Sequence, residues 1–461
     1  MSKTSCTGGQ EENNLKWWQL SLIGVGCIIG TGYFLGSGLA IKMTGPSIII
    51  SFILAAFGTY LVFDVLAKMT ASDPQKGSFC AYAKNAYGRW AGFSCGWVYW
   101  CSEILIIGSQ LTALSIFSRF WFPDIPLWVF AAGYAVLGLL VILAGTKGFE
   151  RIENLFAVIK VSAILMFLII AALALFGVLD GGKPDLKIPD AGDEFFPKGL
   201  KGFWSSLIYA FYAFGGIEIM ALMAINLQRK EDAPKSGKVM LLLLTIIYVL
   251  SIGLAVTMVS WRSFNAEESP FVIALDKYDL PFFPHVFNGA LIIAGFSTMA
   301  ASLFAVTSLL VTLAEGGDAP SFFAKKGKKE KAKEKPPLAA VGLTTAGLAA
   351  SVILALLIPG KIYEYMTTAA GLMLLYNWFF ILLSSGRLLQ LTGWGKVKRI
   401  LGMILIALAV SGTLWQKTSR PGFWMSLLFV VIIGLVVLMM RTKWKKGEGQ
   451  KGILAIKTLG R

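Results

Sequence analysis

The chain has 461 residues, of which 56% are hydrophobic and 15% are charged. Soluble proteins carry about 25% charged residues, so this composition excludes a soluble globular protein and indicates an integral membrane protein. The net charge of +16 does not indicate a nucleic-acid partner, because most basic residues lie in segments predicted on one side of the membrane.

Twelve apolar runs are long enough to cross a hydrocarbon core of about 30 Å, which needs roughly 20 helical residues. The predicted spans are 17–40, 46–68, 90–117, 126–146, 154–178, 200–226, 238–261, 285–314, 337–358, 363–385, 399–415 and 423–441. With this topology most of the 42 Lys and Arg residues lie on one side of the membrane. The positive-inside rule therefore predicts that the tails 1–16 and 442–461 are both cytoplasmic. The densest basic run, 325–335, is expected in a cytoplasmic loop that is attracted to anionic membrane lipid.

The first span is rich in glycine, which costs roughly 1 kcal/mol per residue inside a helix relative to alanine. Its glycines are Gly24, Gly26, Gly30, Gly32, Gly36 and Gly38. They predict a helix that is interrupted at membrane depth, where unpaired backbone groups survive only if they line a cavity or meet a ligand. The sixth span repeats the pattern at 211–218. Two broken helices in corresponding positions are typical of a secondary transporter; the alternative is that the glycines only allow close helix packing.

Seven short motifs follow one another along the chain. They are Ile29–Gly38, Pro74-x-x-Gly77-Ser78-Phe79-x-x-Tyr82-Ala83, Gly96-Trp97-x-Tyr99-Trp100, Phe122-Pro123-Asp124, Glu153-x-x-Phe156-Ala157-x-Ile159-Lys160-Val161, Phe211-x-Ala213-Phe214-Gly215-Gly216-x-Glu218 and Asn377-Trp378. In these motifs, from Trp17 to about Trp378, the chain resembles the bacterial amino acid transporter family of the amino acid–polyamine–organocation superfamily.

The resemblance implies an all-α membrane protein of about 12 transmembrane helices with a leucine-transporter-type 5+5 inverted repeat. The first repeat would cover 17–178 and the second 200–385, with broken first and sixth helices. Two extra C-terminal helices would follow within 399–441.

The resemblance also implies a substrate site at the two breaks. Beside Gly30, the N–H groups of Thr31 and Gly32 would face a substrate carboxylate. The carbonyls near Ile28, Tyr212 and Gly215 would accept from its ammonium group. This fits the partial charges of helix ends, which attract anions at the N-terminus and cations at the C-terminus. The side chains of Tyr212 and Phe214 suggest an apolar lining.

Four charged residues lie at membrane depth, where each charge costs at least about 2.5 kcal/mol: Asp64, Glu103, Lys160 and Glu218. Asp64 and Lys68 are spaced to form an i,i+4 ion pair, which we interpret as structural. Lys160 corresponds to a lysine that occupies the sodium position in similar proton-coupled proteins, which implies a proton-coupling role; alternatively, its ammonium group reaches the inner interface.

Glu218 follows the second break and matches a family glutamate. It either braces the unwound backbone of the first helix or takes part in proton transfer. Glu103 departs from the family pattern. It could select the substrate side chain, carry a proton or pair with Lys160.

The sequence thus predicts a proton-coupled importer of a neutral amino acid, branched-chain or aromatic, in a bacterial plasma membrane. The alternatives are an exchanger, or a sodium-coupled or cationic amino acid transporter with the same fold. An enzyme is disfavoured because the one histidine, His285, has no metal cluster or nucleophile motif beside it. The expected partners are a free amino acid and membrane lipid. No cofactor is expected besides the coupling proton, and the oligomeric state is not indicated.

Overall fold

The computed structural model describes residues 15–75, 77–144, 146–179, 192–324, 336–358 and 360–459. Within these ranges it describes the side chains of all residues except 146–154, 192–193, 222, 443 and 445–459. The basic run 325–335 and most of the N-terminal tail, both assigned to the cytoplasm from the sequence, lie outside the described residues.

The secondary structure of the described residues is helical, apart from one isolated parallel bridge between Leu15 and Leu227. In chain order the α-helices are α1 (Trp17–Ile28), α2 (Thr31–Phe34), α3 (Gly36–Thr44), α4 (Ile48–Ser72), α5 (Ser78–Tyr87), α6 (Arg89–Arg119), α7 (Leu127–Ala144), α8 (Thr146–Leu175), α9 (Gly192–Phe195), α10 (Gly199–Tyr212), α11 (Ile217–Met223), α12 (Ala233–Met258), α13 (Pro270–Leu275), α14 (Phe282–Glu315), α16 (Leu338–Leu357), α17 (Ile362–Leu388), α18 (Gly393–Gly412) and α19 (Arg420–Leu459).

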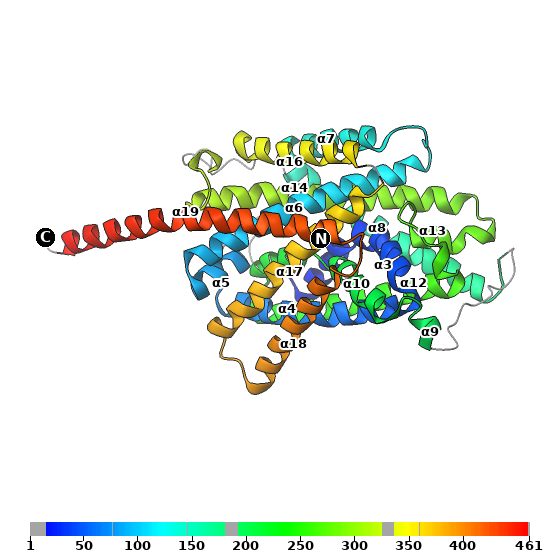
Figure 1. The fold of residues 1–461 in the computed structure, drawn as a ribbon, viewed down its shortest axis with the longest axis horizontal. Helices are drawn as coiled ribbons and strands as arrows, with labels where there is room; N and C mark the ends of the chain where they lie inside the picture. The colour runs from blue at the N-terminus through cyan, green and yellow to red at the C-terminus, as the bar shows by residue number, and fades with distance from the viewer. Residues whose placement is uncertain are drawn as a thin grey trace.

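The long helices form an elongated bundle (Figure 1). Helix α5 lies at one end of the bundle, and α9 and α13 lie at the opposite end. Helices α7 and α16 pack side by side along one edge, next to α6 and α14. The last helix, α19, continues beyond the body of the bundle (Figure 1), so the predicted tail 442–461 is helical as far as Leu459.

Burial separates a central group of helices from a peripheral one. In α6 and α17, 78% of the most apolar stretch is buried inside the protein, against 17% in α7 and α19. The peripheral helices expose large apolar side chains such as Val136, Leu140 and Leu438. An apolar outer surface of this extent is what a lipid environment requires.

Nine helices of the described chain are long and apolar enough to cross a membrane, or ten if α10 and α11 form one bent span. The prediction of about 12 is higher for visible reasons. The first span is divided into short helices, and α2 to α4 form one continuous apolar run, Thr31–Ser72. Helix α18 carries the basic residues Lys396, Lys398 and Arg399 in its first two turns and is not among the apolar helices counted. The exact count of 12 and the inverted repeat stay predictions.

The end of the bundle that carries α5 is closed by contacts between distant segments. Leu15 exchanges backbone hydrogen bonds with Asn226 (3.2 Å) and Gln228 (2.9 Å), which ties the start of the described chain to the segment after α11. At the same end, Arg89 forms an ion pair of 2.8 Å with Asp318.

The predicted pair of Asp64 and Lys68 is present in α4, with 2.7 Å between the charged atoms. The Lys68 side chain is 47% exposed, so this ion pair contributes little to stability.

Candidate substrate-binding site

The first helix is interrupted where its glycines predict. Helix α1 ends at Ile28, and Gly30 is extended (φ −153°, ψ −163°) before α2 begins at Thr31. In the described part of the chain, the N–H groups of Thr31 and Gly32 have no hydrogen-bond acceptor and the Ile28 carbonyl has no donor. The break therefore leaves backbone donors and an acceptor without a partner in the described structure.

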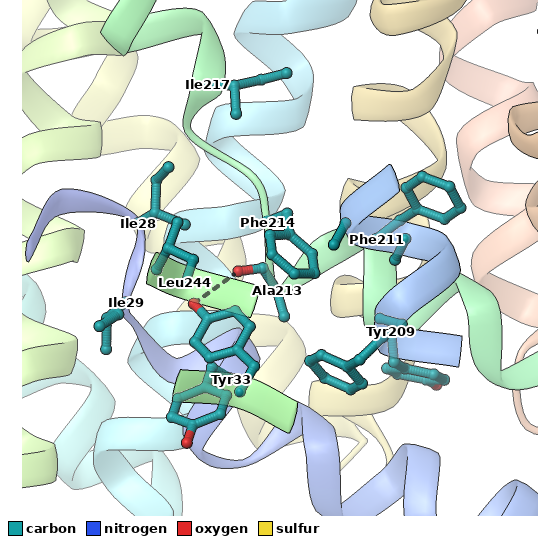
Figure 2. Close-up of a cluster of buried hydrophobic side chains, with 14 of the residues drawn as sticks. Ile28, Ile29, Tyr33, Tyr209, Phe211, Ala213, Phe214, Ile217 and Leu244 are labelled. Carbon is teal, nitrogen blue, oxygen red and sulfur yellow. Dashed lines mark hydrogen bonds between the residues drawn. The ribbon is translucent and has the colours of Figure 1, made fainter. Parts of the chain in front are cut away.

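The sixth helix is interrupted between Tyr212, where α10 ends, and Ile217, where α11 begins. The Gly215 N–H donates to the Tyr212 carbonyl (3.0 Å). The Tyr248 hydroxyl donates to the Ala213 carbonyl (3.1 Å), shown as the dashed line in Figure 2. Gly216 has φ +111°, a conformation that favours glycine. Some of the backbone groups freed by this break are therefore hydrogen-bonded within the protein.

The two breaks lie against each other. A Cβ atom added to Gly32 would be 2.8 Å from the Tyr212 ring, and one added to Gly216 would be 3.3 Å from the Ile28 side chain. Gly32, Gly215 and Gly216 are partly exposed, although the residues before and after these positions are buried. The glycines therefore border accessible space at the junction, as a backbone-binding site requires.

The aromatic residues of the second break differ in their surroundings. The Tyr212 hydroxyl is 2.8 Å from Ser109 Oγ of α6, so this side chain stands between α2 and α6. The Phe214 ring, labelled in Figure 2, is fully buried. It packs against Phe52 and Tyr248, with ring centroids 6.2 and 5.1 Å away. Tyr212 thus contacts both α2 and α6, whereas Phe214 contributes to the apolar core.

Lys160 is buried in α8 with 2% of its surface exposed, and its Nζ donates to the Gly26 carbonyl of α1 (3.2 Å). This position disfavours the alternative in which the ammonium group reaches the inner interface. Helices α1 and α8 approach closely here, because a Cβ atom on Gly26 would be 2.9 Å from Ala157 Cβ. The lysine thus joins α8 to the end of α1, one turn before the break.

Glu218 is fully buried and braces the second break rather than the first. Its Oε2 accepts from the Gly216 N–H (3.2 Å), and its Oε1 accepts from the Trp378 indole of α17. The interpretation that it accepts N–H groups of the first helix is corrected by these partners. The family motif identified the carboxylate, but only the three-dimensional structure places its two donors.

Glu103 is buried in α6, with 4% of its surface exposed, and lies beside Tyr99 and Ser302. Its Oε2 has no hydrogen-bond partner within the described ranges. A buried carboxylate oxygen without a donor is costly, so this atom is available to a proton or a ligand. Glu103 interacts electrostatically with Tyr212 and Glu218, which places it near the second break.

Two further residues contact the first break and were not anticipated. The Tyr363 hydroxyl of α17 donates to the Thr31 carbonyl (3.0 Å). Gly295 of α14 lies so close that an added Cβ would be 2.9 Å from Thr31 Cγ2. A tyrosine in an apolar span indicates that its hydroxyl has a hydrogen-bond partner elsewhere in the fold, because a buried hydroxyl needs one. That signal marks the residue type but not the partner.

Comparison with known proteins identifies the family of the chain. The family model of amino acid permeases matches residues 19–451. The chain is 58% identical to the uncharacterized transporter YcgH of Bacillus subtilis (strain 168), over 96% of this chain and 97% of YcgH. It is 30% identical to the gamma-aminobutyric acid permease of the same organism, over 81% and 79% of the two chains. It is 28% identical to the aromatic amino acid transport protein AroP of Escherichia coli (strain K12), over 94% and 91%.

The chain belongs to the amino acid permease family. This confirms the resemblance to amino acid transporters of the amino acid–polyamine–organocation superfamily and the all-α membrane fold. The permease is a multi-pass membrane transporter for amino acids and not an enzyme. Its site residues and coupling ion remain predictions, to which the geometry above adds an arrangement in space.

Proposed function

We propose that this permease imports a neutral amino acid, branched-chain or aromatic, together with a proton. The observation that carries the proposal is the first break, where the Thr31 and Gly32 N–H groups and the Ile28 carbonyl lack partners in the described structure. A carboxylate complements the donors at the start of α2, and an ammonium group complements the carbonyl at the end of α1. A zwitterionic amino acid provides both groups.

The choice of a neutral side chain rests on the surroundings of the second break. Tyr212 belongs to a cluster with the buried apolar residues Val98, Leu105, Ala370 and Met373. The relatives named above as aromatic amino acid and gamma-aminobutyric acid transporters carry substrates without a net positive charge, which supports this choice.

Proton coupling is proposed because of Lys160. Its buried ammonium group binds the end of α1 through the Gly26 carbonyl. Loss of the proton would remove the charge from this contact and so weaken the attachment of α8 to α1. Proton binding and the arrangement of the broken helix would then be linked.

Glu103 favours a second candidate, the transport of cationic amino acids. The unpartnered Oε2 of this buried carboxylate would bind an amino group at the end of a substrate side chain. The two candidates differ in a measurable way. With the Glu103→Gln variant, a cation transporter should lose its preference for lysine or arginine in competition assays. A transporter of neutral amino acids should keep its ranking.

The test of the proposed function is uptake into proteoliposomes that contain the purified permease. An inward proton gradient should drive accumulation of leucine or phenylalanine, and an inward sodium gradient should not. Accumulation that requires sodium would contradict proton coupling, and uptake that requires an internal amino acid would indicate an exchanger. We place the permease in the bacterial plasma membrane with both termini cytoplasmic, as the distribution of Lys and Arg predicts.

A further inference from the structure

A second site is suggested by a cavity at the end of the bundle opposite α5. The cavity has a volume of about 540 Å³ and lies between the end of α6, the segment 265–268 before α13, and the starts of α14 and α17. Ligand-binding cavities in proteins typically measure about 300–1,000 Å³, so an amino acid fits this space. The distribution of basic residues places this end of the bundle outside the cell.

Tyr363 connects the cavity to the first helix break. Tyr363 lines the cavity, and its hydroxyl donates to the Thr31 carbonyl (3.0 Å). Thr112 also lines it, one helical turn after Ser109, whose Oγ is 2.8 Å from the Tyr212 hydroxyl. A molecule in the cavity is therefore separated from the candidate substrate site by the layer of side chains that contains Tyr363.

The polar lining of the cavity has charges of both signs and two amides. These residues are Arg119, Asn265, Glu267, Glu268, Asn288 and Glu364. Within the described residues, none of its four charged side chains forms an ion pair. Unpaired charges of opposite sign that line one cavity are complementary to a zwitterion.

Asn288 of α14 provides an independent observation that points to a ligand. Its side chain lines the cavity and is 5% exposed, yet its amide has no hydrogen bond to the described part of the protein. A polar ligand in the cavity would satisfy this amide.

The acidic part of the lining is held in place by a turn. Asn265 Oδ1 accepts from the N–H groups of Glu267 (2.8 Å) and Glu268 (2.9 Å), and an added Cβ on Gly38 of α3 would be 3.0 Å from the Asn265 carbonyl. Partial burial, together with the neighbouring Asp276 and Glu267, raises the pKa of Glu268. A cationic group beside Glu268 would relieve this concentration of negative charge.

Glu364 differs from the other two carboxylates. It interacts electrostatically with Lys42 and Lys361, and it also lines a smaller cavity of about 230 Å³ with Lys42 and Lys198. Nearby lysines therefore balance part of its charge. Glu268 is the stronger candidate to bind an ammonium group.

We propose that this cavity is an entry site, which binds the zwitterionic amino acid before it passes Tyr363 to the helix breaks. In this site Glu268 binds the ammonium group, Arg119 binds the carboxylate and the Asn288 amide satisfies a further polar group. The proposal rests on the proposed function, because it concerns the same substrate.

The test measures binding of a tritiated amino acid to the purified permease by equilibrium dialysis. The probe is whichever of the twenty standard amino acids competes best in the uptake assay. The Gly32→Val variant should lose the tight site at the first break but keep one weak site per chain. Adding Glu268→Gln should weaken this remaining binding about tenfold, as expected for one hydrogen bond to a charged group. Adding Asp124→Asn, a control near Pro123 that does not line the cavity, should leave it unchanged.

A second measurement does not depend on the Gly32→Val protein. In otherwise unaltered permease, Glu268→Gln should raise the KM of uptake about tenfold and leave kcat unchanged, because the helix breaks are intact. An unchanged KM in this variant would overturn the entry site, as would a folded Gly32→Val protein that binds no amino acid. Both outcomes leave the proposed function standing. Absence of uptake by the unaltered permease would instead overturn the proposed function.

Discussion

The break between α1 and α2 covers two residues and the break between α10 and α11 covers four, and the longer break has more support. Tyr248 and Glu218 bind backbone groups of the longer break, and Gly215 bonds within it. At the shorter break, Tyr363 binds the Thr31 carbonyl, but the N–H groups of Thr31 and Gly32 lack partners in the described chain. The difference favours the first break as the proposed ligand site, because its backbone groups are unpaired. The second break is held in one conformation by its own hydrogen bonds.

The largest expected effect is at Gly32. In Gly32→Val, the added Cβ would lie 2.8 Å from the Tyr212 ring, closer than non-bonded carbon atoms approach, so the two breaks would be pushed apart. We expect loss of tight substrate binding, measured by equilibrium dialysis, in a protein that still folds. The control is Gly133→Val in α7, where an added Cβ has no neighbour within 4 Å. Tight binding by folded Gly32→Val protein would refute the role of the first break.

The next largest effect is expected at Lys160 of α8, whose ammonium group binds the end of α1. Lys160→Met keeps most of the apolar stem but removes the ammonium group that binds the Gly26 carbonyl. We expect substrate exchange across proteoliposomes to continue and accumulation driven by a pH difference to stop. Substrate that still accumulates in the variant under a pH difference alone would contradict the coupling role of Lys160.

A smaller effect is expected at the brace of the second break. Glu218→Gln replaces one accepting oxygen with an NH₂ donor, which would face either the Gly216 N–H or the Trp378 indole. The mismatch should cost about 1–3 kcal/mol and lower the thermal unfolding temperature. Glu315→Gln, at an exposed carboxylate, serves as the control. If Glu218→Gln changes only substrate affinity and not the melting temperature, Glu218 belongs to the binding site rather than to the brace.

The smallest effects come from a matched pair of hydroxyl deletions, each of which removes one hydrogen bond worth about 1 kcal/mol. Tyr363→Phe leaves the Leu35 N–H as the remaining donor to the Thr31 carbonyl and should change the substrate Kd. Tyr248→Phe frees the Ala213 carbonyl at the second break and should lower the melting temperature. The ring of Tyr248 stacks on Tyr33 with 4.1 Å between centroids, and phenylalanine preserves this contact. The reverse pattern would exchange the roles of the two breaks.

Composition and glycine spacing by themselves predicted a membrane transporter with two interrupted helices, and both interruptions occur where the glycines stand. The reason is local, because glycine weakens a helix wherever it lies and an apolar run of about 20 residues spans a bilayer in any fold. The motif containing Lys160 and the motif containing Glu218 likewise identified the buried charges without a structure.

Only the tertiary structure decided the partners of these residues. Glu218 binds Trp378, which lies 160 positions away in the chain, and Tyr363 reaches Thr31 from 332 positions away. Phe214 looks like a cavity residue in the sequence, but its ring packs into the core against Phe52. A hydrogen-bond partner or the direction of a buried ring depends on which helices meet, and helix packing brings together residues whose spacing along the chain shows no pattern.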